Sequence, residues 1–97
     1  MIIKDDRTEE QKRTHRWAVV ATDRFLSGWG GAEGGSSFAA WACERGDLYD
    51  VERWVRSRSD MQRVRVANLD TYRPSPRTCA HYHIYTVTPG HGALAGR

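Results

Sequence analysis

The residues most able to do chemistry in this chain are a cysteine and two histidines at alternate positions, Cys79, His81 and His83. Thiolate and imidazole are ligands that zinc prefers, and alternation along a strand puts all three side chains on one face. A structural zinc site needs four ligands drawn from two segments. The candidates for the remaining ligands are Cys43, His15 and His91. Because no Cys-x-x-Cys or His-x3-His pair is present, we expect a surface pair of histidines and assign no metal ligand and no cofactor.

A glycine-rich stretch over residues 26–37 suggests phosphate binding, but it fails both common patterns. The segment Gly28-Trp29-Gly30-Gly31-Ala32-Glu33 lacks the spacing of a dinucleotide fingerprint, and a strand follows it where a helix is required. A Walker loop ends in Lys-Ser/Thr, whereas this stretch ends in Gly35-Ser36-Ser37. We therefore expect a long hairpin connection in which Trp29, flanked by glycines, anchors a binding partner.

Nucleophiles and bases are present without a catalytic arrangement. The two cysteines, the serines and the four histidines form no nucleophile elbow and no helix-start motif. A domain this small with one helix seldom encloses a pocket. The sequence therefore predicts no catalytic residues and a protein that is not an enzyme.

The composition fits one small globular domain of 97 residues. The longest apolar run, residues 17–21, is too short to cross a membrane, and the first residues lack a signal-peptide pattern. We therefore expect a cytoplasmic protein that makes no membrane contact and keeps Cys43 and Cys79 as free, buried thiols. The net charge of +3 permits contact with nucleic acid without requiring it.

The hydrophobic pattern predicts four strands and one helix in the order β-β-α-β-β. Alternating apolar residues predict strands over residues 15–25, 38–44, 63–69 and 81–87. The first of these strands is apolar on both faces, as a central strand is. An apolar stripe at helical spacing predicts a helix that begins at the N-cap Asp47 and ends near Arg58.

These elements predict an α+β fold, a four-stranded, mostly antiparallel sheet with the helix on one face and the other face partly open. The polar residues 1–14 are expected to form a flexible arm with one helical turn capped by Thr8. The single domain then covers residues 15–90, and residues 91–97 form a flexible tail.

Arginines supply the most extended candidate contact surface, since only two of the fifteen basic residues are lysines. The predicted surface consists of Arg56, Arg58, Arg63 and Arg65. Further arginines and interleaved tyrosines would extend it toward phosphates and bases: Arg53, Arg73, Arg77, Tyr72, Tyr82 and Tyr85. Interrupting acidic residues favour a solvated surface of mixed charge: Asp47, Asp50, Glu52, Asp60 and Asp70.

The segment Asp23-Arg24-Phe25-Leu26-Ser27-Gly28-Trp29-Gly30-Gly31-Ala32-Glu33-Gly34 resembles a motif of small open reading frames in bacteriophages and prophages. In those proteins a second strand, an acidic helix start and an Arg-Ser-Asp-Met turn follow, here Arg58-Ser59-Asp60-Met61. The resemblance covers residues 17–67 and brings no catalytic residues with it. Because small phage proteins often disarm host defence, it implies an inhibitor of the anti-CRISPR type that binds a host CRISPR effector complex.

We accordingly expect a non-enzymatic inhibitor that blocks nucleic-acid binding or nuclease recruitment by that complex. A basic chain does not mimic DNA as strongly acidic inhibitors do, so it would act by covering a protein surface or touching a bound strand. Beside Trp29, the predicted contacts are Arg24 and Glu33 in the loop and the four arginines of the predicted surface. The alternatives are a small nucleic-acid-binding regulatory module and a virion component that self-assembles. A homodimer through the open sheet face is compatible with each.

Overall fold

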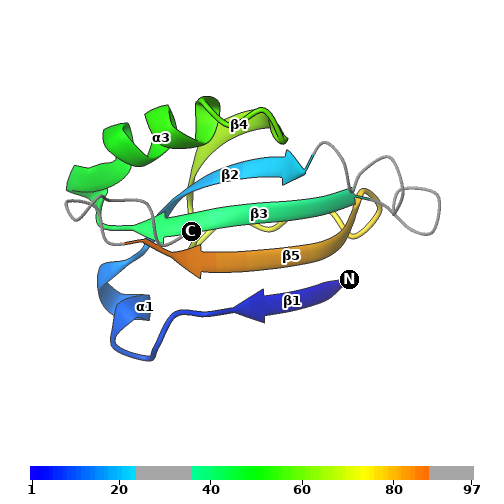
Figure 1. The fold of residues 1–97 in the computed structure, drawn as a ribbon. Helices are drawn as coiled ribbons and strands as arrows, with labels where there is room; N and C mark the ends of the chain where they lie inside the picture. The colour runs from blue at the N-terminus through cyan, green and yellow to red at the C-terminus, as the bar shows by residue number, and fades with distance from the viewer. Residues whose placement is uncertain (24–35, 88–97) are drawn as a thin grey trace.

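The computed structural model describes residues 1–23 and 36–87, which form a five-stranded mixed sheet and one main helix (Figure 1). The strands are β1 (Ile2–Asp5), β2 (Trp17–Asp23), β3 (Ser36–Cys43), β4 (Met61–Asn68) and β5 (Cys79–Thr86). The helical segments are α1 (Gln11–Thr14), the 3-10 turn η1 (Arg45–Asp47) and α3 (Leu48–Arg56). The α+β class and the order of the four predicted strands around the helix are confirmed.

The sheet differs from the prediction in its strand number and its mixture of directions. The strand order is β1-β5-β3-β2-β4; β1–β5 and β5–β3 are parallel, whereas β3–β2 and β2–β4 are antiparallel. Two of the three pairs among the four predicted strands are antiparallel, as predicted, but β5 pairs with β3 in parallel and the additional β1–β5 pair is also parallel, so the sheet is mixed. Two crossovers return the chain in the same direction. One crossover runs through α3 from β3 to β4, and the other runs through residues 69–78 from β4 to β5.

The fifth strand, β1, lies in the segment that the sequence assigned to a flexible arm. Ile2 pairs with His81 and Asp5 with Ile84, and the Asp6 amide donates to the Ile84 carbonyl at 2.9 Å. Four residues without alternation give no strand pattern, and their partner lies at the far end of the described chain. Pairing with a distant strand therefore makes this strand, since local preference does not predict it.

The core has one apolar cluster on each face of the sheet. The cluster under α3 includes Val19, Trp41, Val51 and Val55. The cluster on the opposite face includes Val20, Ala40, Leu69, Tyr82 and Ile84. Residues 18–21 of β2 have no exposed surface, which confirms the predicted central strand.

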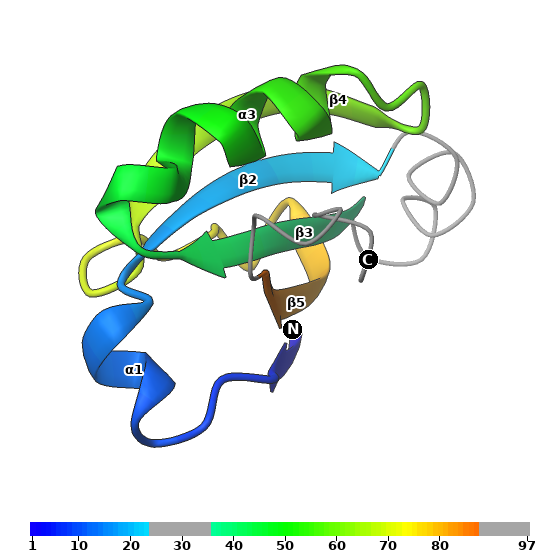
Figure 2. The same cartoon turned by 60° about the vertical axis from the view of Figure 1, so that its left-hand side comes forward.

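The face away from α3 is covered in part, and it stays open at Ile3, which pairs with Tyr82 on this face and is 57% exposed. The crossover of residues 69–78 runs over it and buries Leu69 and Pro74. The Leu69 amide donates to the Arg16 carbonyl at 2.7 Å and attaches the start of this crossover to β2. On the helix-bearing face, α3 packs on β2, β4 and part of β3 and lies away from β1 (Figure 2). A long connection with two prolines gave no sequence signal for this packing.

The helix begins and ends close to its predicted bounds. Asp47 occupies the N-cap position, as predicted, but its side chain makes no capping hydrogen bond. Its amide instead donates to the Glu44 carbonyl at 2.9 Å within η1. At the other end, the Ser57 hydroxyl donates to the Trp54 carbonyl at 2.6 Å. None of the helices in the described part of the chain is long and apolar enough to span a membrane.

Candidate interaction surfaces

The first candidate surface lies on the helix-bearing face over the two strands that α3 does not cover. It consists of Ile2, Lys4, His81, His83 and Tyr85, which we call the β1–β5 surface. Pairing of Ile2 with His81 and of Lys4 with His83 puts these side chains on the same face. Ile2 is 65% exposed and Tyr85 is 37% exposed, so this face presents apolar and aromatic atoms to solvent.

The rings of His83, Tyr85, Trp41 and Trp54 lie in contact one after another beneath this surface, and we call them the aromatic row. His83 and Tyr85 stack with their ring centroids 3.8 Å apart, and Tyr85 stacks on Trp41 at 5.7 Å with an angle of 18° between the ring planes. Trp41 is 2% exposed and contacts Trp54 edge to face at 5.6 Å. Each ring is therefore held by the next, and Tyr85 presents its exposed part from a rigid base.

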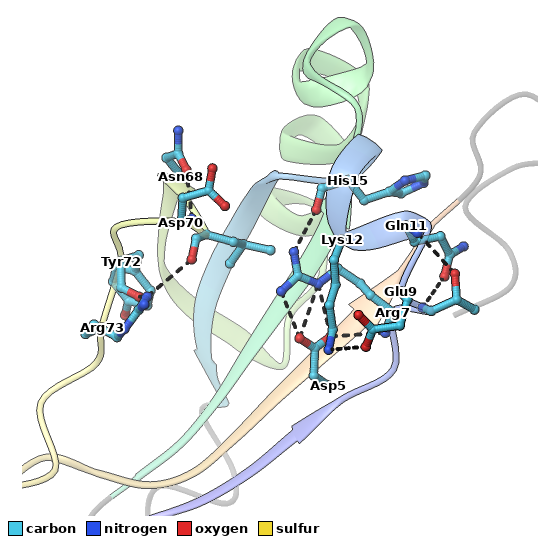
Figure 3. Close-up of polar contacts among 12 residues, drawn as sticks. Asp5, Arg7, Glu9, Gln11, Lys12, His15, Asn68, Asp70, Tyr72 and Arg73 are labelled. Carbon is cyan, nitrogen blue, oxygen red and sulfur yellow. Dashed lines mark hydrogen bonds and ion pairs between the residues drawn. The ribbon is translucent and has the colours of Figure 1, made fainter.

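Polar contacts of the N-terminal segment fix β1 beside β5. A His83 Nε2 to Asp6 Oδ2 contact of 2.8 Å joins the end of β1 to the aromatic row. Arg7 donates to the Asp5 carboxylate through Nε at 3.0 Å and Nη2 at 2.8 Å, and through Nη1 to the His15 carbonyl at 3.0 Å (Figure 3). Burial raises the pKa of Asp5, but the hydrogen bonds and charge of Arg7 outweigh this effect and hold it below its usual value.

The turn that follows β1 contains the cap predicted at Thr8. The Gln11 amide donates to the Thr8 hydroxyl at 3.1 Å, and the Thr8 amide donates to the Gln11 side-chain oxygen at 2.9 Å (Figure 3). This reciprocal pair is a capping box, which satisfies two amides at the start of a helix. The box and the Arg7 contacts therefore hold the segment between β1 and β2 in a defined conformation.

The arrangement that suggested zinc is broken by a β-bulge. Ser36 pairs with Cys79 but Ser37 pairs with His81, so Ala80 is an extra residue and Cys79 turns to the other face. There Cys79 is buried in the second cluster, and its thiol donates to the His81 carbonyl at 3.2 Å. The expectation of all three side chains on one face is therefore wrong. Within residues 1–23 and 36–87, no three His, Cys, Asp or Glu side chains are grouped as a metal site would require.

Both cysteines are free and buried, on opposite faces of the sheet. Burial, followed by the charges of Asp47 and Glu44, raises the pKa of the Cys43 thiol to about 12. Burial likewise raises the pKa of Cys79. A thiol held protonated is a poor nucleophile, so neither group has the environment of a catalytic cysteine.

Arg58, a predicted contact residue, has an internal role. Its Nε and Nη2 donate to the Asp60 carboxylate at 2.9 and 2.6 Å. Its guanidinium lies 5.4 Å from the ring centre of Trp41 and 5.2 Å from that of Trp54. Hydrogen bonding to Asp60 raises the pKa of Arg58 and lowers that of the carboxylate. The Arg58 side chain therefore lies at the end of the aromatic row, against Trp41 and Trp54.

The other three predicted arginines do not share one face. Arg56 pairs with Glu52 at 2.8 Å and donates to the Val64 carbonyl at 3.2 Å, which links α3 to the edge strand β4. Arg65 lies on the opposite face, where its partners include Phe38. Arg63 is exposed and has a positive φ of 57° at a bulge in β4. Arg24, Trp29 and Glu33 lie outside the described residues.

The three tyrosines proposed to stack bases have different environments. Tyr82 is 5% exposed, and its hydroxyl is buried without a hydrogen-bond partner among the described residues. Tyr72 is half-buried and accepts a hydrogen bond from Arg65 at 3.0 Å. Only Tyr85 of the three is classed as exposed. The sequence pattern placed Tyr82 and Tyr85 on a strand and Tyr72 in a loop, but it did not show which of the three rings is buried.

A second basic surface lies along β4 and the crossover of residues 69–78. It consists of Arg63, Arg65, Tyr72, Arg73 and Arg77, which we call the crossover surface. The sequence carries a signal for it, because Asp70 is the only acidic residue after Asp60. The Asp70 carboxylate accepts from Arg16 Nε at 2.6 Å. The predicted surface combined arginines of the helix end with those of β4, which hid the local excess of positive charge along β4 and the crossover.

No protein-family model matches this sequence, and searches of curated proteins and of solved structures gave no match either. The residues and contacts described above are therefore the basis of the functional argument.

Proposed function

We propose that this chain is a non-enzymatic interaction protein that binds a protein partner through the β1–β5 surface. The observation that carries this proposal is the stacked row in which partly exposed Tyr85 rests on buried Trp41. Aromatic side chains held in place before binding are typical energetic centres of protein interfaces. They lose little conformational freedom when the partner arrives, so more of the contact energy contributes to affinity.

The residues around Tyr85 fit such an interface. Ile2 adds an exposed apolar side chain on one side, and His81 and Lys4 add polar groups at the margin. An apolar centre with a polar margin is the usual composition of a protein contact. The internal use of Arg56 and Arg58 is a second reason to place the contact here, since these arginines already have partners within the chain.

The partner we propose is a host CRISPR effector complex, whose nucleic-acid binding or nuclease recruitment the bound chain would block. This part of the proposal rests on the resemblance of residues 17–67 to small phage proteins and on the predicted anchor Trp29. The basic net charge of +3 favours occlusion of a protein surface over mimicry of DNA.

The test is an affinity pull-down of tagged protein from host lysate, with and without nuclease, followed by mass spectrometry. Recovery of effector subunits in both samples supports the proposal. The Tyr85→Ala variant is expected to weaken binding of the recovered complex about 30-fold, because loss of a hot spot costs about 2 kcal/mol or more. The matched control is Tyr49→Ala, which removes a 69% exposed tyrosine on α3.

Two results would contradict the proposal. If Tyr85→Ala and Tyr49→Ala bind equally well while Trp29→Ala does not, the contact lies in the glycine-rich loop and not on the β1–β5 surface. If all partners disappear after nuclease treatment, the chain associates with nucleic acid, and the regulatory-module alternative replaces the inhibitor. Equal thermal stability of the variants shows that each comparison reports binding and not folding.

A further inference from the structure

We infer that the crossover surface binds the phosphate backbone of nucleic acid, independently of any protein bound at the β1–β5 surface. The inference depends on Arg65 and Arg73, which both donate to Tyr72, and on Arg63 and Arg77, which lie close to them along the chain. It assigns a ligand class to a part of the molecule that the proposed protein contact does not use.

Within residues 1–23 and 36–87, the arginines of this surface form no ion pair with a carboxylate. Among the described residues, the ion pairs of Asp5, Glu9, Glu52, Asp60 and Asp70 are made with basic residues outside the crossover surface. Asp70, the acidic residue within the crossover itself, is paired with Arg16. The four arginines of this surface therefore keep their positive charge available to a polyanion.

The donors are held in defined positions before any ligand arrives. The guanidinium of Arg65 lies 5.2 Å from the ring centre of Phe38 and 5.9 Å from that of Tyr72, and its Nη2 donates to the Tyr72 hydroxyl. Arg73 donates through Nη1 to the Tyr72 carbonyl at 2.8 Å and to the Leu69 carbonyl at 3.3 Å (Figure 3). A guanidinium has five N–H donors, so both side chains retain donors for phosphate oxygens.

The composition of this surface favours a nucleic acid over an acidic protein. The large exposed apolar side chains of the described chain lie elsewhere: Met1, Ile2, Ile3, Tyr49, Val66 and Tyr85. A protein interface normally has an apolar centre, whereas a phosphate backbone requires positive charge and N–H donors. The half-buried Tyr72 contacts Arg65 and Arg73 and adds aromatic surface beside their guanidinium groups.

The two candidate surfaces lie on opposite faces of the sheet. Arg65 and Tyr72 belong to the face that carries the second apolar cluster, whereas Tyr85 stacks on Trp41 in the cluster beneath α3. A ligand on one surface therefore need not displace a ligand on the other.

The experiment measures fluorescence anisotropy of labelled 20-nucleotide probes, one single-stranded DNA and one duplex, titrated with the full chain at several salt concentrations. The test variant is Arg73→Ala with Arg77→Ala, and the charge-matched control is Arg13→Ala with Arg53→Ala, which removes two exposed arginines elsewhere. Loss of two phosphate contacts is expected to make the slope of log K against log salt shallower by about 1.4 to 1.8. At 0.1 M salt this corresponds to affinity about 25- to 60-fold weaker, and the control should change both quantities much less.

A second variant keeps the test valid if the double variant is destabilised. Arg77→Glu reverses the charge of an exposed residue whose backbone amide, which the substitution keeps, donates to the Ser75 hydroxyl. It should also weaken binding of both probes. No binding by the native chain, or equal losses in the test and control variants, overturns the inference. Binding to a polyglutamate peptide in preference to both probes also overturns it and identifies an acidic protein as the ligand.

Discussion

Replacing Arg58 should destabilise the domain, because this side chain joins the helix end to the aromatic row. It makes two cation–π contacts, with Trp41 and Trp54, and a two-point ion pair with Asp60. Each cation–π contact at a partly exposed site contributes about 0.5–1 kcal/mol. The ion pair adds about 0.2–1 kcal/mol, a low value because both side chains are about a third exposed. We therefore expect Arg58→Ala to lower the free energy of unfolding by about 1.2–3 kcal/mol.

The assay is urea unfolding followed by far-ultraviolet circular dichroism, because the substitution alters tryptophan fluorescence directly. For a domain of this size the expected loss corresponds to a Tm lower by about 5–24 °C in a separate thermal melt. Arg58→Lys keeps the charge but loses the planar guanidinium and its stacking on the rings. It should therefore be more stable than Arg58→Ala by less than half of the difference between Arg58→Ala and the native chain. Asp60→Asn separates the ion pair from the ring contacts, and Arg13→Ala controls for the removal of an exposed arginine.

Two results would refute this reasoning. If Arg58→Ala is as stable as Arg13→Ala, the ring contacts contribute nothing measurable and Arg58 is free to act as a partner contact. If Arg58→Lys is as stable as the native chain, charge alone explains the effect and the planar geometry of arginine has no role.

Three further predictions follow from single residues. Arg63→Gly should leave stability unchanged or raise it by up to about 1 kcal/mol, because glycine adopts the positive φ of this position without strain. Arg63→Val should lower stability, and a thermal melt of each variant compared with the native chain tests both expectations. Because the pKa of Asp5 is lowered by folding, its contribution to stability is present above about pH 4 and is lost as the pH falls through the folded value. Asp5→Asn should therefore flatten the acid side of the stability curve measured by urea unfolding, and an unchanged curve would contradict the Arg7 pairing. Cys43, with a pKa of about 12, should resist an aromatic disulfide reagent at pH 8 in the folded chain and react after unfolding; fast reaction in the native state would show that its burial is wrong.

Much of the fold is predictable from local pattern, and the errors share a cause. The alternation in β2 predicted a central strand, and the apolar stripe of α3 predicted its packing face. The strand β1 and the crossover of residues 69–78 depend on contacts with distant parts of the chain, so neither has a local pattern that reveals it. The same limit affected the candidate sites, because the bulge at Ala80 moved Cys79 away from His81.

The arginines show a second limit of sequence reasoning. Arg56 and Arg58 look like surface charges in the sequence, since helix periodicity places them away from the apolar stripe. The Arg56–Glu52 pair has the four-residue spacing that favours an ion pair on a helix, so it was foreseeable. The Arg58–Asp60 pair spans two residues after the helix has ended, where helix spacing gives no guide. The stacking of Arg58 on two tryptophans was not foreseeable, because Trp41 and Trp54 meet only after the sheet and helix have packed.

The pairing of β1 with β5 has a consequence for how the chain folds during synthesis. Asp6 and His83, whose side chains meet at the end of this pair, are 77 residues apart. Once the rest of the sheet has formed, docking of β1 closes only the connection of residues 6–16 to β2, at an entropic cost of about 2 kcal/mol. We expect β1 to dock last and to detach first, as a local opening detectable by hydrogen exchange. A nascent chain would then acquire the β1–β5 surface only after β5 has left the ribosome.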